Sequence, residues 1–356
     1  MPRPVAIVSR TLVACLLVAG AAPLPAAPLD LAAVAADAQW LMHFDMDAAR
    51  DSVVVKRAWE RMQKMHPHAA GMMDLAARMT GMDPRKDLRD VTAWGLDTDK
   101  RNGVMLVRGR VNREMLERMA AKAPDHETME HRKHTLHAWT HKGWKGRGRE
   151  KMVGAFHCDD VLVFARAPEQ VKAALDVLDG EAAAVRGDGP LGGRVRPGSI
   201  LVARAAAVDP DTKCPVLKQG RAFRVALGES AGKSFYRARL EMESPAAADA
   251  VEDVVEGFTA LGRLRWGDEA AAMQLVNAVN VDVEGDTCTI VWDGDAEKVA
   301  QVVERAMEEW QRRHRGRRGC PACGKDGCGG CAEGECPMRR GRDGGPAEQP
   351  LRDDEF

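Results

Sequence analysis

The chain has 356 residues, which is enough for about two domains of ordinary size. Its composition is 45% hydrophobic and 29% charged, so it can bury a core and is not disordered as a whole. The formal net charge of −1 supplies no overall positive field, which argues against nucleic acid as a partner.

The first 27 residues have the three parts of an export signal. Arg3 and Arg10 supply positive charge, residues 11–20 are apolar, and small residues through Ala26-Ala27 offer a cleavage site. The apolar stretch is shorter than the ~20 residues that span a bilayer, and no other segment of the sequence is long and apolar enough to cross one. We therefore expect an exported protein, periplasmic or extracellular, with no integral membrane segment once the signal is removed.

The rest of the chain alternates hairpins and helices. Periodicity in the first half predicts, in order, a strand at 38–45, helices at 51–65 and 72–79, strands at 91–96 and 103–110, a helix at 113–122, a hairpin turning at Arg132-Lys133, strands at 152–157 and 161–165, and a helix at 168–178. In the second half it predicts strands at 199–204, 222–228 and 234–242, a helix at 245–264, strands at 281–283 and 288–292, and a helix at 295–310.

Part of this pattern occurs twice. Residues 161–178 align without a gap with residues 289–306, and each copy has the pattern of a strand, a tight turn and an amphipathic helix. The extra length of the first copy falls between Lys122 and Lys151. A strand–helix unit cannot bury its apolar face alone, so the sequence predicts an α+β fold of two tandem repeats, with mostly antiparallel sheets packed against helices. We place the first repeat at 28–190 and the second at 191–310.

Residues 311–356 are rich in Arg, Gly and Pro, have almost no large apolar side chains, and are predicted to be a mostly disordered tail. The tail contains two C-x2-C pairs and a fifth cysteine: Cys320, Cys323, Cys328, Cys331 and Cys336. Four thiolates could hold zinc or copper, but only four residues separate the pairs, whereas a zinc ribbon has ~15–20. Disulfides are the alternative in an oxidising compartment. The spacing leaves a metal site, disulfides or free thiols, and no role all open.

A second group of candidate ligands lies in the histidine-rich hairpin. If Arg132-Lys133 is a two-residue turn, His131 faces His134 on one side of the hairpin. His126, His137 and His141 then share the other side, where they could hold a borderline metal such as zinc or copper. The alternative is a solvated hairpin face whose histidines titrate normally.

Two further motifs have structural interpretations. Gly228-x-Ser230-x-Gly232 has the spacing of a serine hydrolase nucleophile elbow, but its flanks predict strand–turn–strand, which favours a glycine-rich hairpin turn. His43, Asp45 and Asp47 would share a strand face as possible metal ligands. We interpret them instead as a strand end that leads into an N-capped helix.

Three segments carry a family resemblance: residues 36–45, which open with Ala-Asp-Ala and lead into a strand, residues 104–110, and residues 159–164. They resemble a broad group of uncharacterised secreted bacterial proteins with duplicated α+β units. The resemblance implies a secreted protein of repeated α+β structure and brings no catalytic residues with it.

These observations predict a non-catalytic extracytoplasmic protein that binds or scaffolds, with an unknown partner such as another envelope protein. One alternative is metal binding or thiol redox chemistry at the tail cysteines. A second is a serine hydrolase at Ser230.

Overall fold

The computed structural model describes residues 29–65, 67–99, 102–142, 148–187, 189–208, 212 and 217–315. The predicted signal and the five tail cysteines lie outside these residues. The chain divides into two compact units, Met1–Val302 and Val303–Phe356. In the second unit, the described residues are the last turns of helix α8 (Ala296–Arg315).

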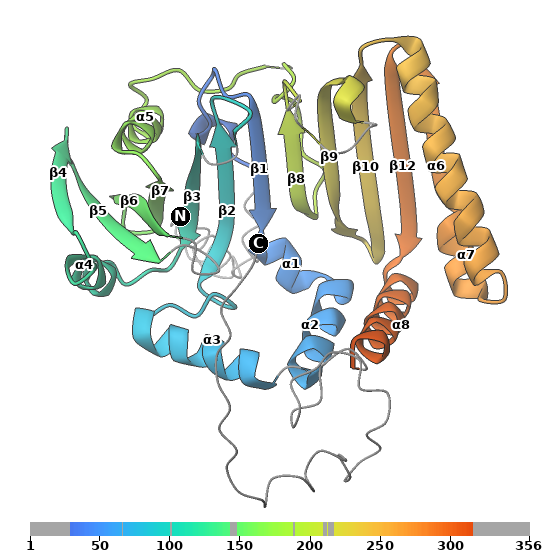
Figure 1. The fold of residues 1–356 in the computed structure, drawn as a ribbon, viewed down its shortest axis with the longest axis horizontal. Coiled ribbons are helices and arrows are strands. Elements are labelled where there is room, and N and C mark those ends of the chain that lie inside the picture. Colours follow the sequence, from blue (N-terminus) through green and yellow to red (C-terminus); the bar gives the residue numbers. More distant parts are fainter. Residues whose placement is uncertain are drawn as a thin grey trace, which may run out of the picture. The chain divides into compact units, whose positions relative to one another are not determined.

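The described strands form one antiparallel sheet of twelve (Figure 1). Those of the first half are β1 (Trp40–Asp45), β2 (Leu88–Gly95), β3 (Gly103–Gly109), β4 (Glu127–His131), β5 (His134–Lys142), β6 (Arg149–Cys158) and β7 (Val161–Ala165). Those of the second half are β8 (Ser199–Ala205), β9 (Gly220–Ser230), β10 (Lys233–Met242), β11 (Val279–Glu284) and β12 (Thr287–Asp295).

The strand order reflects the duplication. Outward from the central β1–β8 pair, one half runs β1-β2-β3-β7-β6 and the other runs β8-β9-β10-β12-β11. Phe164 on β7 and Trp292 on β12, which are equivalent in the sequence alignment, therefore both lie on the fourth strand from the centre. The first half alone continues into β5 and β4. The predicted α+β fold with antiparallel repeats is confirmed; the repeat boundaries at 190 and 310 stay a prediction.

Helices connect the strands. They are α1 (Met46–Asp51), α2 (Val53–Met65), α3 (Pro67–Thr80), α4 (Arg113–Ala121), α5 (Pro168–Leu178), α6 (Pro245–Trp266) and α7 (Ala270–Asn277), with short 3-10 helices η1 (Leu31–Ala33) and η4 (Leu217–Gln219). Of these, α1, α4, α5, α6 and α7 pack against the sheet. Asp45 caps α1 by accepting a hydrogen bond of 2.8 Å from the Ala48 amide, which confirms the N-cap interpretation. No helix in the described part of the chain has both the length and the apolar character needed to cross a bilayer.

Each half has its own core. In the first half, Val171, Ala174 and Leu175 of α5 are fully buried against strand residues such as Leu106 and Val163. In the second half, α6 packs its small residues against β10 and Cys288; these helix residues are Ala247, Ala248 and Val251. On the opposite face of the sheet, α4 lies over β5, β6 and β7.

A carboxylate of the second half caps a helix of the first. Ser52 lies between α1 and α2, and its Oγ accepts a hydrogen bond of 3.2 Å from the Val55 amide. Glu229, on β9, accepts from Ser52 Oγ at 2.8 Å and from the amides of Val53 and Val54 at 3.0 and 3.4 Å. These bonds satisfy backbone donors that the first turn of α2 leaves unpaired, and they place a negative charge at the positive end of the helix.

Replacing Glu229 by Ala should lower the free energy of unfolding by about 1–2 kcal/mol, because the first turn of α2 loses its capping carboxylate. Urea unfolding at neutral pH measures this change. Glu284→Ala, at an exposed position at the end of β11, is the matched control and should cost less than about 0.5 kcal/mol. Equal losses in the two variants would contradict the capping role.

Candidate functional site

The β4–β5 hairpin docks its tip against the end of α5. His131 pairs with His134 across the turn, as the sequence predicts. His131 Nε2 and Arg132 Nε lie 2.9 and 2.8 Å from the same carboxylate oxygen of Asp176. The hairpin tip is therefore held to the helix by ion pairs and hydrogen bonds.

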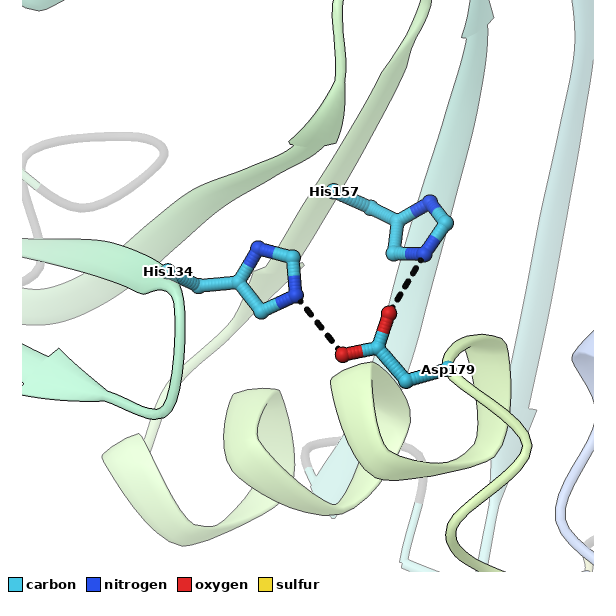
Figure 2. A group of neighbouring side chains, drawn as sticks. All are labelled: His134, His157 and Asp179. Carbon is cyan, nitrogen blue, oxygen red and sulfur yellow. Dashed lines mark hydrogen bonds and ion pairs between the residues drawn. The ribbon is translucent and has the colours of Figure 1, made fainter.

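Asp179, the C-cap residue of α5, is the centre of a denser cluster (Figure 2). One carboxylate oxygen of Asp179 lies 2.9 Å from His134 Nε2. The other lies 3.0 Å from His157 Nε2 and 2.9 Å from Lys133 Nζ. The side chains of Asp179 and His134 are only 8% and 3% exposed. Among the described residues, His134, His157 and Asp179 form the group of three whose ligand atoms lie within 4.8 Å of one another.

Hydrogen bonds at this cluster keep the carboxyl of Asp179 ionised. His134 Nδ1 lies 3.1 Å from the backbone oxygen of Phe156, and its Nε2 faces a carboxylate. Each ring nitrogen of His134 thus faces an oxygen that can accept a hydrogen bond. Burial alone would raise the pKa of Asp179, but hydrogen bonds from Lys133, His134 and His157 hold that pKa well below its usual range.

The bulge at the end of β6 brings His157 into the cluster. The register of β6 against β7 shifts between Phe156 and Cys158, which leaves His157 without a cross-strand partner. Bulges of this kind commonly re-aim a side chain. Sequence analysis paired His131 with His134 but missed Asp176, Asp179 and His157. These two aspartates at the end of a predicted helix, in a chain that also has a basic hairpin, were the sequence signal that could have indicated the contact.

The predicted histidine trio is only partly assembled. His126 Nε2 lies 3.1 Å from His137 Nδ1, and the two rings stack with centroids 5.4 Å apart. His141 does not join them in a three-ligand group. Burial, reinforced by the neighbouring His126, lowers the pKa of His137, so this imidazole is neutral at neutral pH.

An apolar cavity of about 380 Å³ lies between α4 and the sheet. Its lining comes from α4, from the segment just after it and from strands β5, β6 and β7: Leu116, Glu117, Met119, Ala120, Ala123, His137, Trp139, Gly154, Ala155, Phe156, Leu162 and Phe164. A Cβ at Gly154 would lie 2.9 Å from the Phe164 ring and 3.3 Å from Trp139, so this glycine makes room for both rings. The polar side chains of the lining are those of Glu117 and His137.

A third feature is a row of buried polar side chains on β1 and β2. Asp45 and Asp90 are directly opposed, and His43 Nδ1 lies 2.9 Å from Thr92 Oγ1. The Asp90 carboxyl has no hydrogen-bond partner among the described residues. Burial raises its pKa to about 6, with the nearby Asp45 adding to the shift and Arg108 opposing it.

Ser230 lies at the end of β9, in a hairpin whose two turn residues, Ala231 and Gly232, have φ of 50° and 72°. This is the predicted strand–turn–strand geometry and not the strand-to-helix turn of a nucleophile elbow.

Comparisons with known proteins add little to this geometry. A scan against protein-family models found no match, and a search of curated proteins found no significant one. Among solved structures, crystal forms I, III and IV of a protein called TP0453 align at 10–11% sequence identity with TM-scores of 0.41–0.42, over 78% of this chain and 98% of that one.

Removing the central carboxylate of the hairpin cluster should destabilise the protein. Asp179→Asn leaves Lys133 and His134 without their anion, which costs about 2–4 kcal/mol at pH 7 in urea unfolding. The folded-state pKa of Asp179 is depressed, so its contribution is full above pH ~4 and is lost as pH falls further. The difference in free energy of unfolding between wild type and variant should therefore become smaller below pH ~4. The control is Asp159→Asn, at a side chain that is 96% exposed.

Asp90 should behave in the opposite way. The folded-state pKa of Asp90 is raised to about 6. Ionisation of this carboxyl therefore destabilises the folded protein more and more as pH rises from ~4 through 6. Asp90→Asn is expected to raise the free energy of unfolding by about 1–3 kcal/mol at pH 7.5 and to change it little at pH 4. Urea unfolding at the two pH values checks this, with exposed Asp37→Asn as control. A gain of equal size at both values would contradict the assigned pKa.

Proposed function

We propose that this is a non-catalytic extracytoplasmic binding protein whose ligand is a small, mostly apolar molecule held between α4 and the sheet. The cavity there carries the proposal. At about 380 Å³ it falls within the ~300–1,000 Å³ typical of small-molecule sites, and like them it is lined by aliphatic and aromatic side chains with few polar groups.

The lining indicates the chemistry of the ligand. Rings of Trp139, Phe156 and Phe164 and aliphatic side chains of α4 favour an acyl chain or another flexible apolar group. His137 offers an imidazole that is neutral at neutral pH, which suits a hydrogen bond to one polar end of the ligand. Met119 lines the cavity and is 41% exposed, so this side chain of α4 lies between the cavity and solvent.

The same lining supports binding over catalysis. In its described residues it offers one carboxylate and one imidazole, Glu117 and His137, together with apolar groups, and no Ser, Thr, Cys or Lys nucleophile. Export rests on the N-terminal sequence pattern. Metal or thiol chemistry at the tail rests on the cysteine spacing alone.

Filling the cavity should weaken binding without unfolding the protein. The probe is cis-parinaric acid, a fluorescent fatty acid, titrated into the mature chain. Ala120→Phe places a ring in the cavity from α4 and should weaken binding at least about tenfold, a loss of roughly 1.4 kcal/mol.

The matched control is Ala121→Phe, at the exposed next residue of the same helix, which should bind within about twofold of wild type. Circular dichroism checks that both variants fold. Absence of probe binding to the wild type, or equal weakening by both variants, would rule out this site.

A further inference from the structure

We infer that His134, His157 and Asp179 form a binding site for one zinc ion. The three side chains come from separate elements: the first residue of β5, the bulge at the end of β6, and the C-cap of α5. Figure 2 shows both imidazoles turned toward the carboxylate, and the three ligand atoms lie within 4.8 Å of one another. The inference is independent of the apolar cavity and of the tail cysteines.

The donor set suits zinc. Two imidazole nitrogens and one carboxylate oxygen are ligands that Zn²⁺ prefers, and three protein ligands leave the fourth tetrahedral position open to water. Magnesium and calcium favour sites made of oxygen atoms. The ligands belong to rigid backbone, since two lie on paired strands and the third ends a helix whose apolar face is buried.

An outer hydrogen bond already orients the most buried ligand. His134 Nδ1 donates to the Phe156 backbone oxygen at 3.1 Å, which leaves Nε2 aimed at the site. A ligating histidine usually makes such a bond through its other nitrogen, and the bond fixes the ring for coordination. His134 is thus held in the orientation that zinc requires.

Without metal, protons and an ammonium group occupy the place of the ion. Zinc would coordinate both Nε2 atoms in place of a proton, which would leave to solvent, and each ring would keep a hydrogen on Nδ1. The Lys133 ammonium, 2.9 Å from Asp179, would leave the carboxylate for solvent, to which its side chain is already 68% exposed. Lys133 is therefore a competitor of the metal.

The experiment is a calorimetric titration of ZnCl₂ into the full mature chain at pH 7.5. Ser replaces all five tail cysteines in this background, so that their thiolates bind no zinc. We expect one zinc per chain, with an affinity that falls at pH 5.5 as protons compete for the imidazoles. His157→Ala should weaken binding at least about tenfold.

Two variants make the test specific. Lys133→Met removes the competing cation and keeps all three ligands, so it should strengthen zinc binding by about tenfold. His126→Ala removes a histidine of the same hairpin region that lies outside the site, and it should leave the affinity unchanged within about twofold.

Several outcomes would overturn the inference. The first is that neither the background protein nor Lys133→Met binds zinc. The second is that His157→Ala still binds zinc with the original affinity. The third is that Lys133→Met leaves the zinc affinity unchanged or lowers it. Loss of binding in His126→Ala alone would assign the zinc to the His126–His137 pair instead. Because Lys133→Met removes no ligand and alters an exposed side chain, it decides the question even if His157→Ala fails to fold.

Discussion

The antiparallel pairing of β1 with β8 is the interaction on which the rest of the structure depends. It aligns Trp40 with Ala205 and Phe44 with Leu201, and it turns two repeats into one sheet. Each repeat alone would expose its first strand as an open edge, which invites aggregation. Pairing at the centre removes both edges and fixes the two halves in register. Glu229 at the end of β9 and the first turn of α2 reinforce the same junction from opposite halves.

Both candidate sites lie where the two repeats differ. The first repeat inserts the β4–β5 hairpin, and strand alternation sends successive residues of β5 to opposite faces. His134 and Leu136 face α5, where one joins the Asp179 cluster and the other the core. His137 and Trp139 face α4 and line the apolar cavity. The inserted β4–β5 hairpin thus contributes residues to both sites. The architecture that the two repeats share holds this hairpin in place.

Sequence reasoning reached the fold through local pattern and internal comparison. The match of residues 161–178 with 289–306 predicted two equivalent strand–helix units, and the turn at Arg132-Lys133 correctly paired His131 with His134. The sites required contacts that no local pattern shows. His134 and His157 reach Asp179 across 45 and 22 residues, and Ser52 reaches Glu229 across 177. The bulge at His157 and the cavity beside Gly154 arise from packing, which composition and periodicity do not encode.

Native-state hydrogen exchange of the mature protein tests the central claim, one sheet joined at β1 and β8, most directly. In a continuous sheet both strands are internal, so their backbone amides should exchange only through global unfolding, with equal free energies of opening in the two strands. Amides of the edge strands β4 and β11 should exchange faster, through local opening. Amides of β1 and β8 that exchange as readily as those of the edge strands, or with separate opening energies for the two halves, would contradict the account.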